Sequence, residues 1–315
     1  MIKRTLYFGN PAYLSLKDAQ LIVKLPGVVN NDTLTETFKR EAVANIPIED
    51  IGVIMLDNSR ITLTSGVLEA LLENNVAVVN CNATHHPVGL FMPLSGNTIQ
   101  NERYRAQLAA TEPLKKQLWM HTIIQKIKNQ AAVLATQNID SGYLMNLSKN
   151  VKSGDTDNCE ATAAAHYWAR VFVPTSPLGG QGAFIRHREG ASPNNYLNYG
   201  YALLRATMAR SIVGAGLLPT LGIHHANRYN AYCLADDLME PYRPFVDKVV
   251  LEIIKKHGVN DDLPKEIKTD LLQIPVLDVM LDGEKSPLMN ATQRTAVSIV
   301  KCFTGDLRKP LYPEL

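Results

Sequence analysis

The chain has 315 residues and a mass of 34.8 kDa, which is long enough for two domains that each bury a core. Hydrophobic residues make up 46% of the chain and charged residues 20%, as in ordinary globular proteins, and these values exclude a membrane protein and a chain that is disordered throughout. The formal net charge is only +2, so the overall balance does not indicate a polyanionic partner.

The cysteines and the first residues bear on the cellular compartment. The four cysteines lie far apart and form no C-x-x-C pair, so neither a zinc ribbon nor a disulfide framework is indicated. The apolar stretch before Gly9 is too short for a signal peptide, and no run approaches the roughly 18 apolar residues of a membrane span. We therefore expect a cytoplasmic protein without membrane contact.

Residues 1–93 are predicted to form a β-rich domain. Apolar stretches typical of strands cover residues 5–8, 13–16, 21–25, 51–56, 76–80 and 88–92. Turn formers such as Asn10-Pro11 and Pro26-Gly27 separate the first of these stretches, as in hairpins. Residues 65–73 carry apolar side chains at helical spacing, so we expect one helix in this domain.

Residues 94–100 are predicted to be a linker, because turn formers coincide there with a change from strand to helix patterning. Residues 101–315 read as an all-α domain. Helices are expected at residues 103–110, 113–136, 140–149, 157–171, 199–215, 232–257, 264–271 and 286–304. Residues 174–198 lack regular patterning, and loops of that length are often functional. The predicted fold class is α+β.

Positive charge gathers at the start of the helical domain. Residues 101–152 contain eight Lys or Arg and only three acidic residues. Such a stretch is typical either of a solvated helical face or of a surface that binds nucleic acid.

Several common motifs are absent. Gly179-Gly180-Gln181-Gly182 is not followed by the Lys and Ser or Thr of a phosphate-binding loop. Neither G-x-S-x-G nor H-E-x-x-H occurs. Nucleotide-cofactor chemistry, a serine nucleophile elbow and a zinc-protease site are therefore not indicated.

An acidic segment next to paired histidines is the leading candidate site. On a helix, Asp236 and Asp237 would share a face with Glu240, and His224-His225 lies shortly before them. A cation would relieve the repulsion between these carboxylates, and imidazole with carboxylates suits Mg²⁺ or Mn²⁺. The alternative is a solvated acidic face.

Glu160 is the second unusual residue. It begins a predicted helix whose next turns are rich in alanine, so another helix can approach closely and partly bury the carboxylate. A buried carboxylate needs a partner. The alternative is a charge that only interacts favourably with the helix dipole at its N-terminus.

Several short sequence motifs follow one another along the predicted helical region. They are Glu160 with residues 164–168, residues 195–202 (NYLNYGYA) with Leu204-Arg205, residues 215–219 (AGLLP), residues 222–225 (GIHH), residues 237–244 (DLMEPYRP), Cys302-Phe303 with Gly305, and Tyr312-Pro313. This pattern closely resembles the CRISPR-associated spacer-acquisition integrases, the larger catalytic subunit of the pair that inserts new spacers.

The resemblance implies a β-sandwich-like N-terminal domain for dimer and partner contacts, and an all-helical catalytic domain. It places a metal site on Glu160, His225 and Glu240, where many relatives have Asp at the last position. It gives supporting roles to Asp237 and His224, and the choice between the two histidines stays open, with His225 favoured. The doubled His and its spacing to residue 240 resemble the type II branch.

The activity implied by the resemblance is that of a divalent-metal-dependent DNA endonuclease and integrase of CRISPR adaptation. It would use Mg²⁺ or Mn²⁺ and insert short duplex DNA into a repeat array by attack of a 3′-hydroxyl on a phosphodiester, with the ion neutralising charge on the phosphate oxygens. The implied partners are the spacer duplex and the CRISPR repeat, a second copy of the chain, the smaller acquisition subunit and, as a further candidate, the large effector nuclease, in a prokaryotic cytoplasm.

Residues around the site have expected roles as well. Asn227 or Asp236 is a candidate for orienting His225. The cations that would hold DNA phosphates are Lys115, Lys116, Arg186, Arg188, Arg205, Arg228 and Arg243. For any one of these arginines, a structural ion pair is the alternative.

Two other functions remain open on the sequence. A non-catalytic DNA-binding structural protein would bind DNA regardless of metal and of Glu240. A metal phosphohydrolase of small substrates would act on generic phosphate esters. The His-Asp dyad typical of one such superfamily is missing, because Ala226 follows His225.

Overall fold

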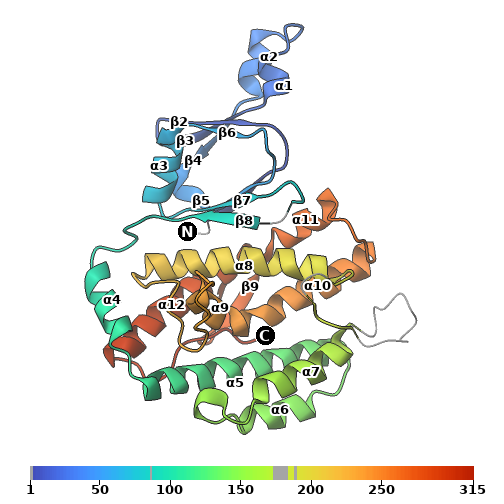
Figure 1. Cartoon of the computed structure of the whole chain (residues 1–315). Coiled ribbons are helices and arrows are strands. Elements are labelled where there is room, and N and C mark those ends of the chain that lie inside the picture. Colours follow the sequence, from blue (N-terminus) through green and yellow to red (C-terminus); the bar gives the residue numbers. More distant parts are fainter. Residues whose placement is uncertain (1–2, 86, 173–183, 188–189) are drawn as a thin grey trace. The chain divides into compact units, whose positions relative to one another are not determined.

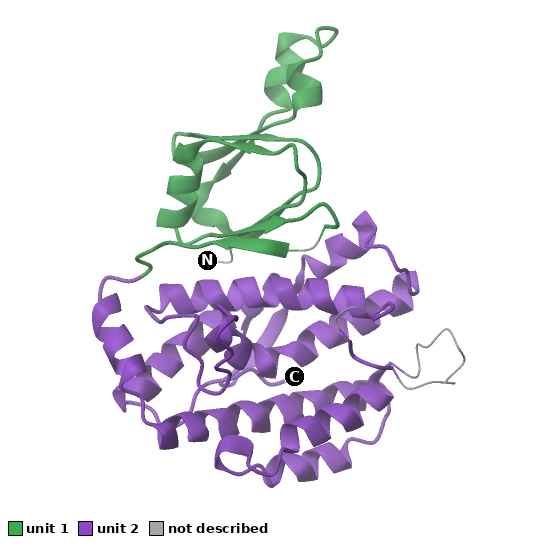
Figure 2. Ribbon diagram, viewed as in Figure 1, with its two compact units in different colours: residues 1–96 green, residues 97–315 purple. Residues whose placement is uncertain are grey.

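The computed structural model describes residues 3–85, 87–172, 184–187 and 190–315. The chain divides into two compact units, residues 1–96 and 97–315 (Figure 2). This division falls within the segment for which a linker is predicted, whereas the dimer and partner contacts expected of the first domain stay predictions.

The first unit contains two four-stranded sheets (Figure 1), with strand orders β1-β5-β7-β8 and β4-β3-β2-β6. The strands are β1 (Arg4–Phe8), β2 (Tyr13–Lys17), β3 (Gln20–Lys24), β4 (Ala44–Pro47), β5 (Ile51–Leu56), β6 (Thr62–Leu63), β7 (Ala77–Cys81) and β8 (Pro87–Phe91). Strand β1 pairs in parallel with β5 rather than in a hairpin with β2, while β2 and β3 form the expected hairpin.

One hydrophobic core joins both sheets with helix α3 (Ser65–Glu73). Leu14 and Leu21 from one sheet, Ile54 and Val78 from the other, and Leu71 from α3 belong to the same buried cluster. Both sheets contain parallel and antiparallel pairs, unlike the antiparallel sheets of a β-sandwich, so that detail of the expected fold is not confirmed.

The expectation of a single helix in this unit is wrong. Two short helices, α1 (Pro26–Val29) and α2 (Glu36–Glu41), precede β4, and a 3-10 turn, η1 (Ile48–Asp50), follows it. Pro26 occupies the first turn of α1, where its missing N–H costs nothing, and the Thr35 hydroxyl accepts a hydrogen bond from the amide of Phe38 at the start of α2.

The second unit is mainly helical. Its elements are α4 (Gln100–Leu108), α5 (Glu112–Thr136), α6 (Gly142–Lys149), η2 (Ser153–Asp155), α7 (Cys159–Val171), α8 (Asn194–Gly214), α9 (Cys233–Met239), η4 (Glu240–Tyr242), α10 (Arg243–His257), α11 (Lys265–Leu271), η5 (Ile274–Val276), β9 (Asp278–Leu281), β10 (Glu284–Pro287) and α12 (Leu288–Thr304). Helix α8 is buried along most of its length and packs against α9, α10 and α12, while α5 packs against α6, α7, α10 and η4 (Figure 1).

The expectation of an all-α second domain is wrong, because β9 and β10 form an antiparallel hairpin. Val279 and Leu281 are buried in the alternation of a strand, and Asp282-Gly283 supplies the two positive φ angles of a tight hairpin turn. The helix expected from residue 286 begins only at Leu288, because Ser286 and Pro287 belong to β10.

Two other helix boundaries differ from expectation. The predicted helix at 232–257 is divided into α9, η4 and α10, because Pro241 and Pro244 cannot donate the backbone hydrogen bonds of a continuous helix. Helix α8 begins at Asn194, so the end of the irregular stretch expected at 174–198 is helical. Residues 173–183 and 188–189 of that stretch lie outside the described residues.

The middle of α5 holds two other segments in place. The Asn129 side-chain amide donates to the carbonyls of Pro241 (2.7 Å) and Pro313 (2.9 Å). The Thr122 and Tyr312 hydroxyls are 2.7 Å apart. The turn η4, which starts with Glu240, is therefore fixed beside α5.

Among the described helices, none has the length and apolar character needed to cross a membrane.

Candidate metal centre

Glu240 lies where α9 ends and η4 begins, and its side chain is only 5% exposed. Its Oε1 atom is 3.0 Å from Nε of Arg243. Its Oε2 atom is 2.6 Å from Nζ of Lys126, so each oxygen of this buried carboxylate has a cationic partner. Burial alone would raise the pKa of Glu240, but Arg243 and Lys126 outweigh it and lower the pKa.

Glu160 lies in the first turn of α7, and Asp155 fixes that turn. The Asp155 carboxylate accepts hydrogen bonds from the backbone amides of Cys159 and Glu160, both at 2.9 Å. These amides have no partner within the helix, so Asp155 serves as its cap. The Oε1 atom of Glu160 accepts a hydrogen bond of 2.6 Å from Nζ of Lys126.

Lys126, in the middle of α5, therefore bridges the two predicted metal ligands. Its side chain is only 11% exposed. Burial alone would lower the pKa of Lys126, but Glu240 and Glu160 outweigh it and raise the pKa, which keeps the ammonium charged. Counted by sequence, Lys126 belongs to the basic stretch, yet the fold places it inside the site.

Asp237 organises the loop that carries the histidines. Its carboxylate accepts hydrogen bonds from the backbone amides of Ile223 (2.7 Å), His224 (2.9 Å) and His225 (3.2 Å), and lies 2.5 Å from Nδ1 of His225. This last hydrogen bond raises the pKa of His225, although burial acts in the opposite direction. With the proton on Nδ1, the lone pair of Nε2 is available to a metal.

The two histidines have different surroundings. His224 stacks face to face on the buried ring of Trp119, with centroids 4.0 Å apart. His225 meets the same ring edge-on at 5.7 Å and interacts electrostatically with Glu240 and Glu160. The geometry therefore favours His225 as the ligand and gives His224 a packing role.

Asp237, rather than Asn227 or Asp236, orients His225. Asp236 receives two hydrogen bonds from Arg205, at 2.6 and 3.0 Å, and one from Asn230 at 2.7 Å. The acidic segment is therefore not a solvated face, because Asp236, Asp237 and Glu240 are all buried and each has its own partner.

Whether these residues fit a divalent ion can be tested on their donor atoms. Glu160 Oε1 and Glu240 Oε2 each lie 2.6 Å from Nζ of Lys126, so two carboxylate oxygens from different helical elements converge on one cation. Carboxylate and imidazole donors suit Mg²⁺ or Mn²⁺. No three His, Cys, Asp or Glu side chains of the described segments gather closely enough to hold an ion as they stand. The carboxylate oxygens of Glu160 and Glu240 are suitable ligands for such an ion, and the ammonium of Lys126 lies between them.

All four described arginines that are expected to hold DNA have partners within the fold, and Arg228 pairs with its neighbour Tyr229, an exposed residue. Arg205 pairs with Asp236, and Arg243 pairs with Glu240 and lies 4.9 Å from the centroid of the Tyr201 ring. Arg186 donates to the side chains of Asn194 and Asn198, at 2.9 and 2.7 Å. The predicted contact at Arg188 lies outside the described residues.

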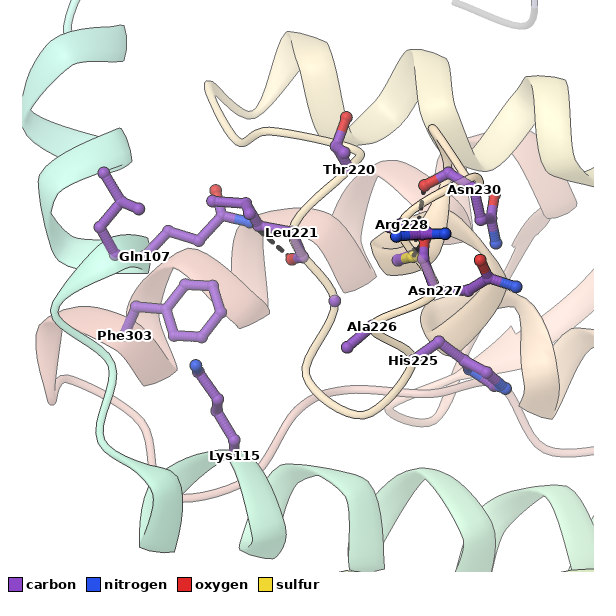
Figure 3. Close-up of a pocket in the computed structure, with 13 residues that line it drawn as sticks. Gln107, Lys115, Thr220, Leu221, His225, Ala226, Asn227, Arg228, Asn230 and Phe303 are labelled. Atoms are coloured by element: carbon purple, nitrogen blue, oxygen red, sulfur yellow. Dashed lines mark hydrogen bonds between the residues drawn. The ribbon is translucent and has the colours of Figure 1, made fainter.

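Two of the expected cations line a cavity of about 370 Å³ (Figure 3). Lys115 extends into it from α5, Arg228 belongs to the loop after His225, and His225 lies at its edge (Figure 3). Lys116 lies outside the cavity, and its aliphatic chain covers Gly154. Glu160 and Glu240 are not part of the lining, so the cavity adjoins the carboxylate pair and does not contain it.

Comparison with known proteins decides the family. The family model described as CRISPR associated protein Cas1 matches residues 7–270. The chain belongs to the Cas1 family. The CRISPR-associated endonuclease Cas1 of Neisseria meningitidis serogroup C (strain 8013) is 34% identical over 318 residues, which cover 100% of this chain and 97% of that protein. The family expected from the sequence is thus confirmed.

Solved structures show the Cas1 fold over nearly the whole chain. A casposase bound to its integration product matches with a TM-score of 0.73 and 20% identity, covering 98% of this chain and 92% of that one. A chain of a Cas6-RT-Cas1–Cas2 complex matches with a TM-score of 0.72 and 19% identity, covering 98% of this chain and 36% of that longer one. These matches confirm a mixed α and β fold with N-terminal strands and a C-terminal helical region.

Proposed function

We propose that this Cas1-family chain is a divalent-metal-dependent DNA endonuclease and integrase of CRISPR adaptation, which inserts short duplex DNA into a repeat array by attack of a 3′-hydroxyl on a phosphodiester. The observation that carries the proposal is the convergence of Glu160 and Glu240 on one point, each 2.6 Å from the same ammonium. Full-length similarity to a protein named an endonuclease supports it.

In this proposal Glu160, His225 and Glu240 hold Mg²⁺ or Mn²⁺. When bound, the ion supplies positive charge for the nonbridging oxygens of the phosphate and lowers the pKa of the attacking hydroxyl. Asp237 keeps the proton of His225 on Nδ1 and so leaves Nε2 available as the metal ligand.

We assign the phosphate contacts to the cations that line the cavity beside His225. Lys115 and Arg228 are the best placed, and binding through them would weaken as salt rises. Lys115 and Arg228 pair only with the exposed side chains of Glu112 and Tyr229. Arg186, Arg205 and Arg243 pair with buried side chains, so we assign them to holding the site together.

The partners are part of the same proposal. One similar structure is a Cas6-RT-Cas1–Cas2 complex and another is a casposase bound to its integration product, which supports a smaller acquisition subunit and DNA as partners. Assembly as a homodimer, contact with the large effector nuclease, membership of the type II branch and a cytoplasmic location follow from the sequence resemblance and stay predictions.

The test is a strand-transfer assay. The protein, with and without the smaller subunit, is mixed with a short duplex bearing 3′-hydroxyls and a supercoiled plasmid that contains the repeat, in Mg²⁺, Mn²⁺ or EDTA. We expect joining only with metal, and a loss of at least about a hundredfold in Glu160→Gln, His225→Ala and Glu240→Gln, because each removes one ligand.

The matched control is Glu252→Gln, which removes an exposed carboxylate from α10 and should leave joining unchanged. Circular dichroism verifies the fold of every variant. DNA binding without joining or cutting in any metal, with the smaller subunit present, would instead favour a non-catalytic DNA-binding subunit.

A further inference from the structure

Lys126 is the most unusual residue of the site, because an ammonium lies where two acidic ligands converge. Its neighbours on the same face of α5 are buried, both the apolar Ile123 and the polar Asn129, so the lysine lies on the buried face of the helix. A buried lysine without a specific partner would be costly, and here its partners are Glu160 and Glu240.

The charges around this point depend on Lys126. Arg243 also pairs with Glu240, through its other carboxylate oxygen. In the part of the chain that the structure describes, no cation other than Lys126 lies within ion-pair distance of Glu160. The two carboxylate oxygens each lie 2.6 Å from the same nitrogen, so without this ammonium two like charges would face each other at close range and repel.

We propose that Lys126 is an internal counter-ion that competes with the divalent ion for Glu160 and Glu240, so that metal binds only when the ammonium moves aside. This inference rests on the proposed function, because it takes these two carboxylates as metal ligands. Mg²⁺ requires oxygen ligands at about 2.0–2.1 Å, and an ammonium 2.6 Å from both oxygens occupies the same space.

The side chain allows this exchange. Lysine carries its charge on four methylene groups with rotatable bonds, so the ammonium can leave the carboxylates while the stem stays against the core. The metal ion then supplies the positive charge that Lys126 supplied before. The affinity of the protein for the ion is reduced by the free energy needed to break the ion pairs of Lys126. Lys126 would thereby set how much free metal the protein needs.

The experiment measures metal binding directly. The full chain is titrated with Mn²⁺ by calorimetry, and its thermal midpoint is recorded in EDTA and in Mn²⁺, for wild type, Lys126→Met and Lys128→Met. Methionine keeps an unbranched chain of similar length and removes the charge. The Lys128→Met control makes the same change at an exposed position two residues along α5.

For Lys126→Met we expect Mn²⁺ to bind at least about tenfold more tightly than to wild type, since no ion pair has to be broken first. The midpoint in EDTA should fall, because the carboxylates lose their counter-ion, and the rise on adding Mn²⁺ should exceed that of wild type. Lys128→Met should match wild type. Lys126→Gln, which is also uncharged and can donate hydrogen bonds, replaces the Met variant if that variant does not fold.

Equal or weaker Mn²⁺ binding by the uncharged variants would overturn the competition. The proposed metal centre is judged separately by Glu240→Gln. If wild type binds Mn²⁺ and Glu240→Gln does not, the centre stands whatever Lys126 does. If neither wild type nor the Lys126 variants bind Mn²⁺, the metal centre itself is wrong.

Discussion

At the scale of single residues, Gly222 determines whether the histidine loop can close around Asp237. A Cβ atom at this position would lie 2.3 Å from the backbone oxygen of His225 and 2.7 Å from Oδ2 of Asp237. The first atom belongs to the histidine loop and the second to the α9 carboxylate that holds this loop, so neither can move without disturbing the site. Glycine is required here for close approach rather than for an unusual backbone angle.

Gly222→Ala should therefore displace His225 and destabilise the fold. We expect a loss of about 1–3 kcal/mol in the free energy of unfolding, as in other overpacked sites, measured by urea denaturation. Strand transfer should fall on the order of a hundredfold, because small displacements of a metal ligand are costly. Gly66→Ala is the control, since its new methyl group meets nothing within 4 Å. Unchanged joining in Gly222→Ala would show that the loop tolerates the methyl group.

The sequence predicts the residue types of the site better than their contacts. The resemblance to the family, rather than spacing alone, predicts Glu160, His225 and Glu240 as metal ligands. The ion pairs of Lys126 with two of these carboxylates are not predicted, because a count of charges treats every lysine as part of the surface. The signal for these ion pairs is the position of Lys126 on the buried face of α5, where a cation needs a buried partner.

At the scale of the elements, one buried carboxylate joins three helices. Asp247 of α10 accepts hydrogen bonds from the hydroxyls of Tyr167 of α7 (2.9 Å) and Tyr201 of α8. Burial raises the pKa of Asp247 to about 6, although the two tyrosine hydrogen bonds act in the opposite direction. Because α7 carries Glu160 and α10 follows directly after Glu240, this junction lies between the elements that hold both carboxylates.

The raised pKa predicts a pH dependence of stability. In the unfolded chain the carboxyl group of Asp247 loses its proton near pH 4, whereas in the folded protein it keeps the proton up to about pH 6. The stabilisation is therefore complete below about pH 4 and is lost as the pH rises through about 6, by an amount on the order of 3 kcal/mol. Asp247→Asn cannot ionise, so wild type should lose stability relative to this variant between pH 4 and 7.

Urea denaturation of both proteins at several pH values checks this expectation. Asp262→Asn, at an exposed position before α11, should keep the pH profile of wild type. Parallel profiles for wild type and Asp247→Asn would mean that Asp247 ionises as easily in the folded protein as in the unfolded chain.

Regular apolar spacing makes some elements predictable, whereas turn residues and side-chain hydrogen bonds set the bounds of others. The apolar spacing of residues 65–73 and 51–56 predicted α3 and β5 with the observed bounds. The hairpin of β9 and β10 was missed although Asp282-Gly283 is a strong turn signal, because the flanking strands are only four residues long. The start of α8 was placed too late, because Asn194 and Asn195 favour turns in isolation and are ordered here by contacts with the chain around residues 185 and 260.

At the scale of the whole molecule, the candidate metal centre belongs to one unit alone. Glu160, His225, Glu240 and Lys126 all lie within residues 97–315, and the first unit has its own hydrophobic core. Calorimetry of the full chain should therefore show two unfolding transitions. Mn²⁺ should raise the midpoint temperature of only one transition, by about 5–10 °C, at an Mn²⁺ concentration near a hundred times its dissociation constant.

EDTA should return that transition to its original midpoint and leave the other in place. A single transition, or two that shift together with metal, would show that the units unfold as one and that the separate cores do not act independently.

The stacking of Trp119 on His224 gives the protein a spectroscopic probe at its candidate site. The chain contains only two tryptophans, and the other, Trp168, lies on α7 against Phe172. With Trp168 replaced by phenylalanine, all indole fluorescence would come from a ring that touches both histidines. The excited state of indole responds to nearby charge and polarity, so rearrangements of the histidine loop could be followed in time by emission, without a label and without turnover.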